Sequence, residues 1–281
     1  MLDLFDLPER SAKPRTSGIT HVLDKGIGLR QMEDLLETSS TYIDILKLGW
    51  GTGYVTQNVF EKIKAYHAAG VPVCFGGTFV ELAILQGRFD QFRGMAKDAG
   101  ITHVEISNGV VDMPPREKSR YIRELARDFF VLSEVGSKDS ERIIPPYRWV
   151  EFIQSDLDAG ARKVICEARE SGSVGLYFGT GEVRSGLIDE IVAKIDPVDL
   201  IFEAPQKTQQ VWLVRKFGSE VNLGNISTSE VIGLETLRLG LRADTMADFH
   251  SVDEWNERRE AEAAAEGGAP TKRRPQRTLI S

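Results

Sequence analysis

The sequence predicts an α/β protein that folds as a single (β/α)8 barrel, or TIM barrel. Short runs rich in Ile, Leu and Val recur along the chain, and each ends in a charged residue or a glycine-rich turn. Helical patterns separate these runs, as expected for parallel strands joined by helices. Eight such units fit between residues 18 and 247, and a barrel of this kind takes about 250 residues as one domain.

The expected strands and helices alternate along the chain. Apolar runs without alternation favour strands covered on both faces. Such strands are expected at about 19–26, 42–48, 71–75, 103–106, 129–135, 163–168, 200–204 and 221–224. Helices are expected at about 29–37, 57–69, 115–127, 148–158, 188–194, 208–217 and 229–239, with further helices up to residue 99. Gly70, Gly100 and Gly160 are typical helix ends, and Pro114 with Pro115 suits a first turn.

Two terminal segments flank the predicted barrel. Residues 1–17 contain two prolines and are expected to form an irregular arm. Residues 248–281 are rich in Glu, Arg and Ala and have few apolar side chains, so a frayed helix and a disordered tail are expected. The basic run 272–274 could contact an anionic partner, although a solvated tail is the favoured interpretation.

The composition is that of an ordinary globular protein. Hydrophobic residues make up 41% and charged residues 27% of the chain, and the formal net charge of −7 argues against nucleic-acid binding. The two cysteines, Cys74 and Cys166, lie in apolar runs and are expected to be buried and free. Neither a signal peptide nor an apolar stretch of membrane-spanning length is evident, so a cytoplasmic protein without a membrane partner is expected.

Charged residues at the strand ends are the main functional signal. Six of them close or follow apolar runs: Lys25, Lys47, Glu105, Glu134, Glu167 and Glu203. The carboxyl ends of barrel strands meet at one mouth, where such enzymes carry out catalysis. Two lysines do not neutralise four glutamates, and Mg²⁺ with carboxylate ligands would balance the charge. Alternatively, some glutamates form ion pairs with Lys or Arg.

Two glycine turns are candidate anion sites. Gly76-Gly77-Thr78 follows the third strand and Gly224-Asn225 the eighth, where backbone N–H groups can approach a phosphate. Gln206 and Lys207 follow the seventh strand. Ser227 to Glu230 also fits a capping box, which is a purely structural interpretation.

Other residue types give no functional pattern. His21, His67, His103 and His250 lack metal-ligand spacing, and His21 and His103 fall early in strands, where a structural role is favoured. No Ser/His/Asp set or dinucleotide fingerprint is evident. Trp50 and Trp212 are interpreted as packing residues.

Several motifs together resemble the phosphosulfolactate synthase family, from about Lys13 to Thr245. They are GITHV with DKG at 18–26, KLGWGT at 47–52, GGT at 76–78, EISNG at 105–109, SEVG at 133–136, EARESG at 167–172, FEAPQK at 202–207, NLGNI at 222–226 and LETLRLGLR at 234–242. The resemblance implies a (β/α)8 lyase that adds sulfite to phosphoenolpyruvate with Mg²⁺, giving phosphosulfolactate, an early step towards coenzyme M.

The resemblance also implies roles for individual residues. Glu105, Glu134 and Glu167 are candidate metal ligands, and Lys25 and Lys47 are candidates for the substrate carboxylate or sulfite. Arg169, Lys207 and Asn225 would hold the phosphate, with Gly77 and Glu203 as further substrate contacts. Lys138 is the candidate general acid, and Lys207 is the second choice.

Two alternatives to this function remain open. Proteins resembling the family occur where no coenzyme M is made, including plant heat-stress proteins, so a non-catalytic barrel with an interaction role during stress is one. A related enzyme that uses another small nucleophile is the other. The chain departs from the family pattern in its tail after Thr245 and at Phe75, where proline is common. Relatives suggest a homo-oligomer.

Overall fold

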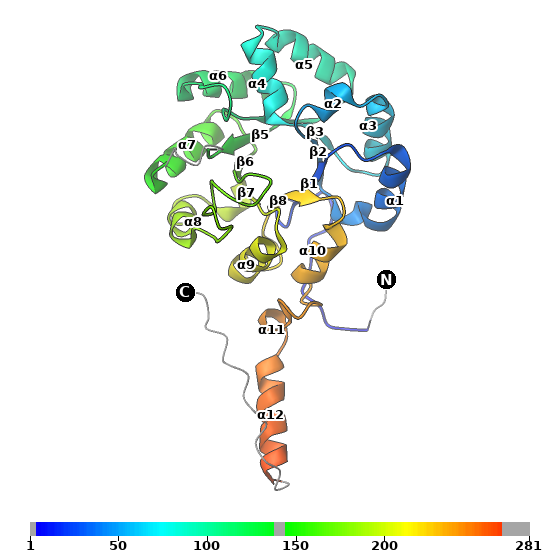
Figure 1. The fold of residues 1–281 in the computed structure, drawn as a ribbon, viewed down its shortest axis with the longest axis vertical. Helices are drawn as coiled ribbons and strands as arrows, with labels where there is room; N and C mark the ends of the chain where they lie inside the picture. The colour runs from blue at the N-terminus through cyan, green and yellow to red at the C-terminus, as the bar shows by residue number, and fades with distance from the viewer. Residues whose placement is uncertain (1–3, 138–143, 266–281) are drawn as a thin grey trace.

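A computed structural model describes residues 4–137 and 144–265, and these form the predicted closed barrel (Figure 1). Strands β1 to β8 are parallel and pair in chain order, with β8 closing onto β1. They are β1 (Thr20–Asp24), β2 (Ile45–Leu48), β3 (Val73–Phe75), β4 (His103–Ile106), β5 (Phe130–Val135), β6 (Lys163–Cys166), β7 (Leu200–Glu203) and β8 (Leu223–Ser227).

Helices cover the outside of the barrel, as Figure 1 shows. The described helices are α1 (Leu29–Ser39), α2 (Thr52–Val55), α3 (Val59–Ala68), α4 (Gly77–Leu85), α5 (Phe89–Asp98), α6 (Pro115–Leu125), α7 (Pro146–Asp158), α8 (Ser185–Val192), α9 (Lys207–Phe217), α10 (Val231–Arg238), α11 (Met246–Phe249) and α12 (Val252–Ala265), the last of which lies away from the barrel. Short 3-10 turns lie at Ser40–Tyr42 and Pro197–Asp199. None of the described helices combines the length and apolarity needed to traverse a bilayer.

Two apolar layers build the barrel. The larger cluster lies between the strands and the helices, and a smaller one fills the barrel interior with residues that include Ile45, Cys74, Leu132, Ile165 and Ile201. Side chains alternate between the faces of a strand, so the residue two positions after an inner residue also faces inward. Lys47 lies two positions after Ile45, and Glu134 lies two after Leu132. In the same way, Glu167 follows Ile165 and Glu203 follows Ile201. The inner core therefore places them at the carboxyl-end mouth.

The eighth strand differs most from its predicted position. It begins at Leu223, because Asn222 is buried and uses its side chain to close the barrel seam. Its Oδ1 accepts from the Ile19 N–H at 3.0 Å, and its Nδ2 donates to the Leu200 carbonyl at 2.8 Å. The register of β1 and β8 shifts at this point.

Two local predictions are wrong. Glu230 precedes α10 and makes no side-chain cap bond, so the capping box at Ser227 is absent. Trp50 is not a packing residue. Its side chain is 51% exposed, and the positive φ of Trp50 and Gly51 turns the chain into the unpredicted helix α2.

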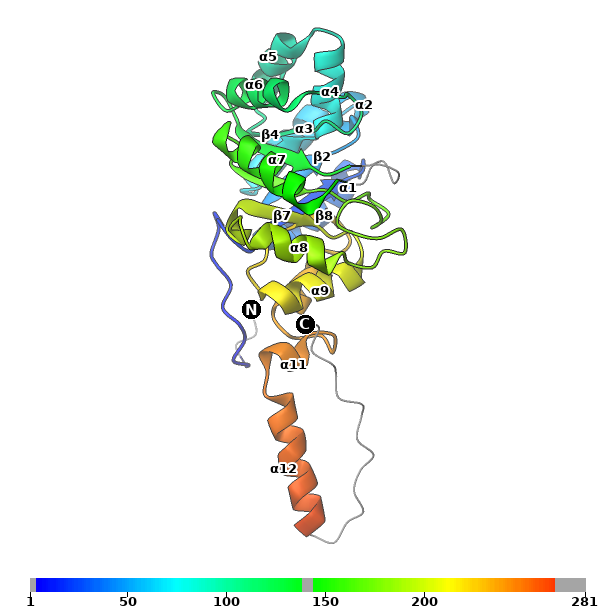
Figure 2. The ribbon, with the colours of Figure 1, turned by 90° about the vertical axis from the view of Figure 1, so that its left-hand side faces the viewer.

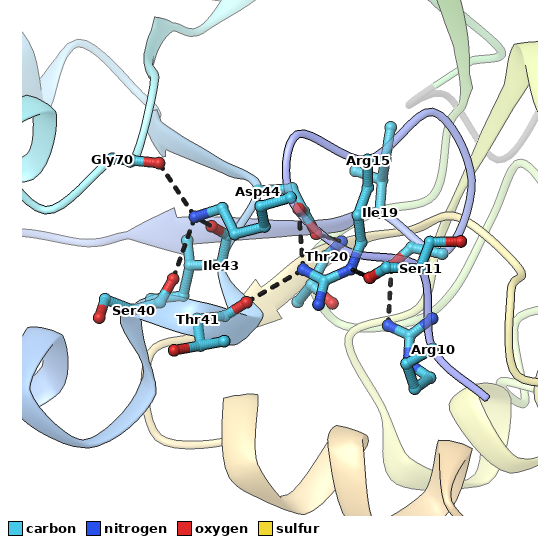
Figure 3. A network of polar contacts seen from close by, with 12 residues as sticks. Arg10, Ser11, Arg15, Ile19, Thr20, Ser40, Thr41, Ile43, Asp44 and Gly70 are labelled. Carbon is cyan, nitrogen blue, oxygen red and sulfur yellow. Dashed lines mark hydrogen bonds and ion pairs between the residues drawn. The ribbon is translucent and has the colours of Figure 1, made fainter. Parts of the chain in front are cut away.

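The N-terminal arm is irregular, as predicted, and its basic side chains fasten it to the amino-end face of the barrel (Figure 3). The Lys13 ammonium donates to the carbonyls of Ser40, Ile43 and Gly70 at 3.1, 2.6 and 3.0 Å. Arg15 pairs with Asp44 at 3.1 Å. The arm therefore lies at the end of the barrel opposite the predicted active site.

The last helix extends away from the barrel. In Figures 1 and 2, α12 projects downward beyond α11, and the strands and the other helices lie above α11. Its described side chains are mostly exposed, including Trp255 at 57%. Asp248 still pairs with Arg215 at 3.0 Å, so the chain leaves the barrel surface after the predicted composition boundary at residue 248.

Candidate active site

One buried lysine lies among three glutamates at the mouth of the barrel. The Lys47 Nζ is 2.7 Å from Glu105 Oε2, 3.1 Å from Glu134 Oε1 and 3.8 Å from Glu203 Oε1. These residues come from β2, β4, β5 and β7, and all four are less than a tenth exposed. Four of the six strand-end residues predicted to converge therefore form one buried cluster, and the predicted alternative of mouth ion pairs also describes them.

Backbone N–H groups hold two of these carboxylates. The N–H of Gly77, at the start of α4, donates to Glu105 Oε2 at 3.1 Å, and the N–H of Ala168 donates to Glu203 Oε2 at 2.8 Å. A Cβ on Gly76 would lie 3.4 Å from Lys47 Cε, so a glycine there lets the β3 turn pack against the lysine. Gly77 is a predicted substrate contact. In the structure, its N–H group donates to Glu105 instead.

The electrostatics of the cluster follow from an excess of carboxylates in a buried place. Burial and the neighbouring Glu134 raise the pKa of Glu105 to about 8. Burial also raises the pKa of Glu203 well above its usual value, against the opposing effect of Lys47. For Lys47, burial favours the neutral amine, but the three carboxylates outweigh it and raise its pKa well above the usual value. The cluster would gain free energy from a further positive charge.

Glu167 lies beside this group, directly after β6. It is 3% exposed, and its charge contributes to the raised pKa of Glu203. A Cβ on Gly136 would lie 2.6 Å from Glu167 Cβ, so only glycine allows the β5 exit to pass this close. The predicted set Glu105, Glu134 and Glu167 therefore lines one side of the mouth.

Two residues that sequence reasoning missed hold the long loop after β6. The Tyr177 hydroxyl donates to the Glu203 carbonyl at 2.6 Å, and Gln209 Nε2 donates to the Gly172 carbonyl at 2.7 Å. Both side chains are buried. The sequence offered one signal for the buried position of Tyr177. A large aromatic ring in a glycine-containing loop usually packs against the protein.

Lys25 and Lys207 do not join the buried cluster. The Lys25 side chain is half exposed, lies 3.9 Å from Glu170 and stands over the Trp50 ring at 5.0 Å. Lys207 is exposed and donates to both Asp244 carboxylate oxygens at 3.2 Å. Lys25 follows β1, which ends at Asp24, and does not share the buried cluster of Lys47, while its role towards the substrate stays a prediction.

The remaining predicted residues are Arg169, Asn225 and Lys138. Arg169 is exposed in the loop after β6. Asn225 lies in β8 with a φ of 55°, and its buried Oδ1 has no hydrogen-bond partner in the described structure. Lys138 lies outside the described residues.

His21 lies in the barrel interior below Lys47. It is fully buried, and neither ring nitrogen bonds to a described residue. Burial, with Lys47 as the next cause, lowers its pKa to about 3, so the ring is neutral. His103, predicted with it as structural, stacks on Phe130 at 4.6 Å.

The chemistry of the mouth fits Mg²⁺ only in part. The donors are carboxylate oxygens, and burial, with the neighbouring carboxylates as a further cause, raises the pKa values of Glu105 and Glu203. In the described parts of the chain, however, no three His, Cys, Asp or Glu side chains are arranged to hold a metal ion, since Lys47 lies between the carboxylates. One or two of these glutamates could serve as ligands together with water and substrate oxygens.

A closed (β/α)8 barrel with buried ionisable groups at the strand ends is the architecture of barrel enzymes that act on small molecules. The family model described as (2R)-phospho-3-sulfolactate synthase (ComA) matches residues 8–244. The chain belongs to the phosphosulfolactate synthase family.

Three curated relatives illustrate the range of similarity. The phosphosulfolactate synthase of Bacillus subtilis is 43% identical over 86% of this chain and 97% of its own. That of Methanothermobacter thermautotrophicus is 44% identical over 87% of this chain and 98% of its own. The protein HEAT-STRESS-ASSOCIATED 32 of Arabidopsis thaliana is 23% identical over 82% of this chain and 88% of its own.

Proposed function

We propose that this protein is a Mg²⁺-dependent carbon–sulfur lyase that adds sulfite to phosphoenolpyruvate and releases phosphosulfolactate. Family membership supports the reaction. The observation that carries it is Lys47, a buried ammonium held by three carboxylates at the mouth. A fixed positive charge there suits a reaction that builds negative charge on its substrate.

The chemistry assigns a task to each part of the mouth. The sulfur lone pair of sulfite attacks the methylene carbon, and the electrons of the double bond move towards the carboxylate. Lys47 would compensate this charge, and the exposed Lys25 would attract the anionic substrate at the rim. Mg²⁺, held by residues among Glu105, Glu134 and Glu167, would supply Lewis-acid stabilisation.

A proton must then reach the carbon that bears the phosphate. Lys138 remains the proposed acid, in the segment that follows β5. Lys207, the second choice, is tied to Asp244 and would have to leave this partner. Arg169 and Asn225 remain the proposed phosphate contacts, and Asn225 would donate to the phosphate from its Nδ2 amide. Its buried Oδ1 suits a donor such as bound water.

The first test is the complete reaction. Purified protein is mixed with phosphoenolpyruvate, sulfite and Mg²⁺, and loss of the enol phosphate absorbance is followed with phosphorus NMR of the product. We expect loss that requires sulfite and stops with EDTA. Lys47→Met should be inactive, while Lys64→Met, at an exposed position of α3, should match the wild type.

The two alternatives give different results. Calorimetric binding of phosphoenolpyruvate and Mg²⁺ without turnover would point to another nucleophile. Absence of binding would favour the alternative of a non-catalytic barrel with a role during stress; one relative is named for its association with heat stress. A homo-oligomer in the cytoplasm remains our expectation, and light scattering would test the oligomer.

A further inference from the structure

A buried carboxylate on α4 binds the loop that follows β4. Glu81 is 1% exposed, and its two oxygens accept four hydrogen bonds from this loop. The donors are the Ser107 hydroxyl and the N–H groups of Gly109, Val110 and Val111, the last three at 3.2, 2.8 and 2.6 Å. All four donors belong to residues 107–111, so Glu81 binds one short segment of the chain.

Among the described residues, the contacts of the Glu81 carboxylate are the four neutral hydrogen-bond donors above and include no cationic side chain. A buried charge is costly unless it is well hydrogen-bonded, so an apolar residue would serve a purely packing role better. Consecutive backbone N–H groups that point to one place form a binding site for an anion. Here the Glu81 carboxylate is the anion that occupies this site. Its local effect is to fix the loop in one conformation.

The same helix also holds the active-site glutamate. Gly77 lies four residues before Glu81, and residues spaced by four share one face of a helix. The Gly77 N–H binds Glu105, and a Cβ on Gly77 would lie 2.7 Å from Ser107 Cβ. Glu105, Ser107 and the following loop are therefore attached to α4 at two points one turn apart.

We infer that Glu81 is a positioning residue for the active site, acting through the 107–111 loop and the Gly77–Glu105 hydrogen bond. The inference rests on the proposed function, with phosphoenolpyruvate as the substrate that this side of the mouth faces. Without the Glu81 carboxylate, the loop would leave Gly77, and Glu105 would lose its fixed orientation towards Lys47.

The test uses the full chain with Glu81→Gln, which keeps the size of the side chain but presents an amide group to backbone donors. Glu81→Asp keeps the charge, and Glu61→Gln changes an exposed glutamate on α3 as the control. Amide hydrogen exchange is measured at 109–111 and at 104–106, together with kinetics and phosphoenolpyruvate binding by calorimetry.

We expect Glu81→Gln to exchange at least about 10-fold faster at 109–111 with strand β4 unchanged. We also expect kcat/KM to fall about 10- to 100-fold, with a higher KM because the loop is loosened and a lower kcat because Glu105 no longer holds Lys47 in place, as for other residues that orient ligands. Glu81→Asp should recover part of this loss, and Glu61→Gln should match the wild type.

Two results would overturn the inference: faster exchange at the loop with unchanged KM and affinity, or faster exchange throughout the barrel in both Glu81 variants. Wild-type turnover in the same assay tests the proposed function separately. Loop exchange and phosphoenolpyruvate affinity decide the role of Glu81 whether or not that turnover is found.

Discussion

At the scale of single residues, Lys47 is distinguished from Lys25 by its surroundings. Lys47 is buried against three carboxylates, whereas the Lys25 side chain is half exposed beside one distant glutamate. A charge fixed in a water-poor site stabilises a transition state more strongly than a mobile charge at the rim. The two lysines should therefore affect different kinetic constants.

Substituting each lysine by methionine tests this difference. Lys47→Met should lower kcat by at least about 100-fold, the range seen when one fixed transition-state contact is removed. Lys25→Met should raise KM with a smaller effect on kcat, because it alters substrate attraction. Steady-state kinetics with varied phosphoenolpyruvate measure both. Equal losses of kcat in the two variants would contradict the assignment.

His21 should make the protein sensitive to acid. Its pKa is about 3 in the folded state because of burial and Lys47, and about 6.5 in an unfolded chain. Below pH 6.5 the unfolded state binds the proton more readily, so the free energy of unfolding falls as pH drops from 6.5 towards 3. The loss should be about 2 kcal/mol at pH 5, at about 1.4 kcal/mol per unit.

Urea denaturation of wild type and His21→Gln at pH 7.5 and pH 5 measures this effect. Comparing the two pH values within each protein removes the cost of the substitution itself. The variant should show a smaller loss between the two pH values, by about 2 kcal/mol. An identical loss in both proteins would mean that His21 takes up no proton on unfolding in this range.

At the scale of elements, the strands were largely predictable, since charged or glycine residues mark their exits. The period of two then places Lys47, Glu134 and Glu203 on the inner face once the strands are assigned. Lys25 could not be placed this way. The strand ends at Asp24, whose carboxylate faces outward to Lys62 at 2.5 Å and Tyr66 at 3.0 Å.

The contacts of Glu81, Tyr177 and Gln209 could not be predicted from the sequence. Each joins segments at least 26 residues apart, and the donors are mostly backbone groups, which leave no signature in residue type. The shift of β8 has a similar origin, because the Asn222 side chain takes the place of strand pairing at the seam. Local pattern gives the order of elements, and long-range polar contacts set their ends.

The N-terminal arm should contribute stability without contributing to activity. Lys13 gives three hydrogen bonds to carbonyls at the amino-end face, far from the mouth (Figure 3). Lys13→Met should lower the free energy of unfolding by about 2 kcal/mol, as for hydrogen bonds to charged groups. Lys64→Met is the matched exposed control. Urea denaturation measures the loss, and a parallel fall in kcat would contradict the separation of arm and site.

At the scale of the whole molecule, the chain divides into a barrel and a projecting helix. The family match ends at residue 244, and the strands and catalytic-end contacts all lie before it. Residues 244–250 still contact the barrel, through Lys207 with Asp244, Arg215 with Asp248, and the close approach of His250 to Gly240. Helix α12 extends beyond these contacts (Figure 2).

A chain that ends at Ser251 should therefore keep both stability and activity. The described side chains of α12 are mostly exposed, so their removal exposes little apolar surface and should change Tm by less than about 2 °C. A chain that ends at Arg242 would also lose the Asp244 and Asp248 contacts, and its Tm should fall further. Calorimetry and steady-state kinetics on both chains measure this. If removal of α12 alone lowered kcat or Tm as much as the longer deletion, α12 would have to contact the barrel or a second copy in solution, and its projection from the barrel would not describe the working protein.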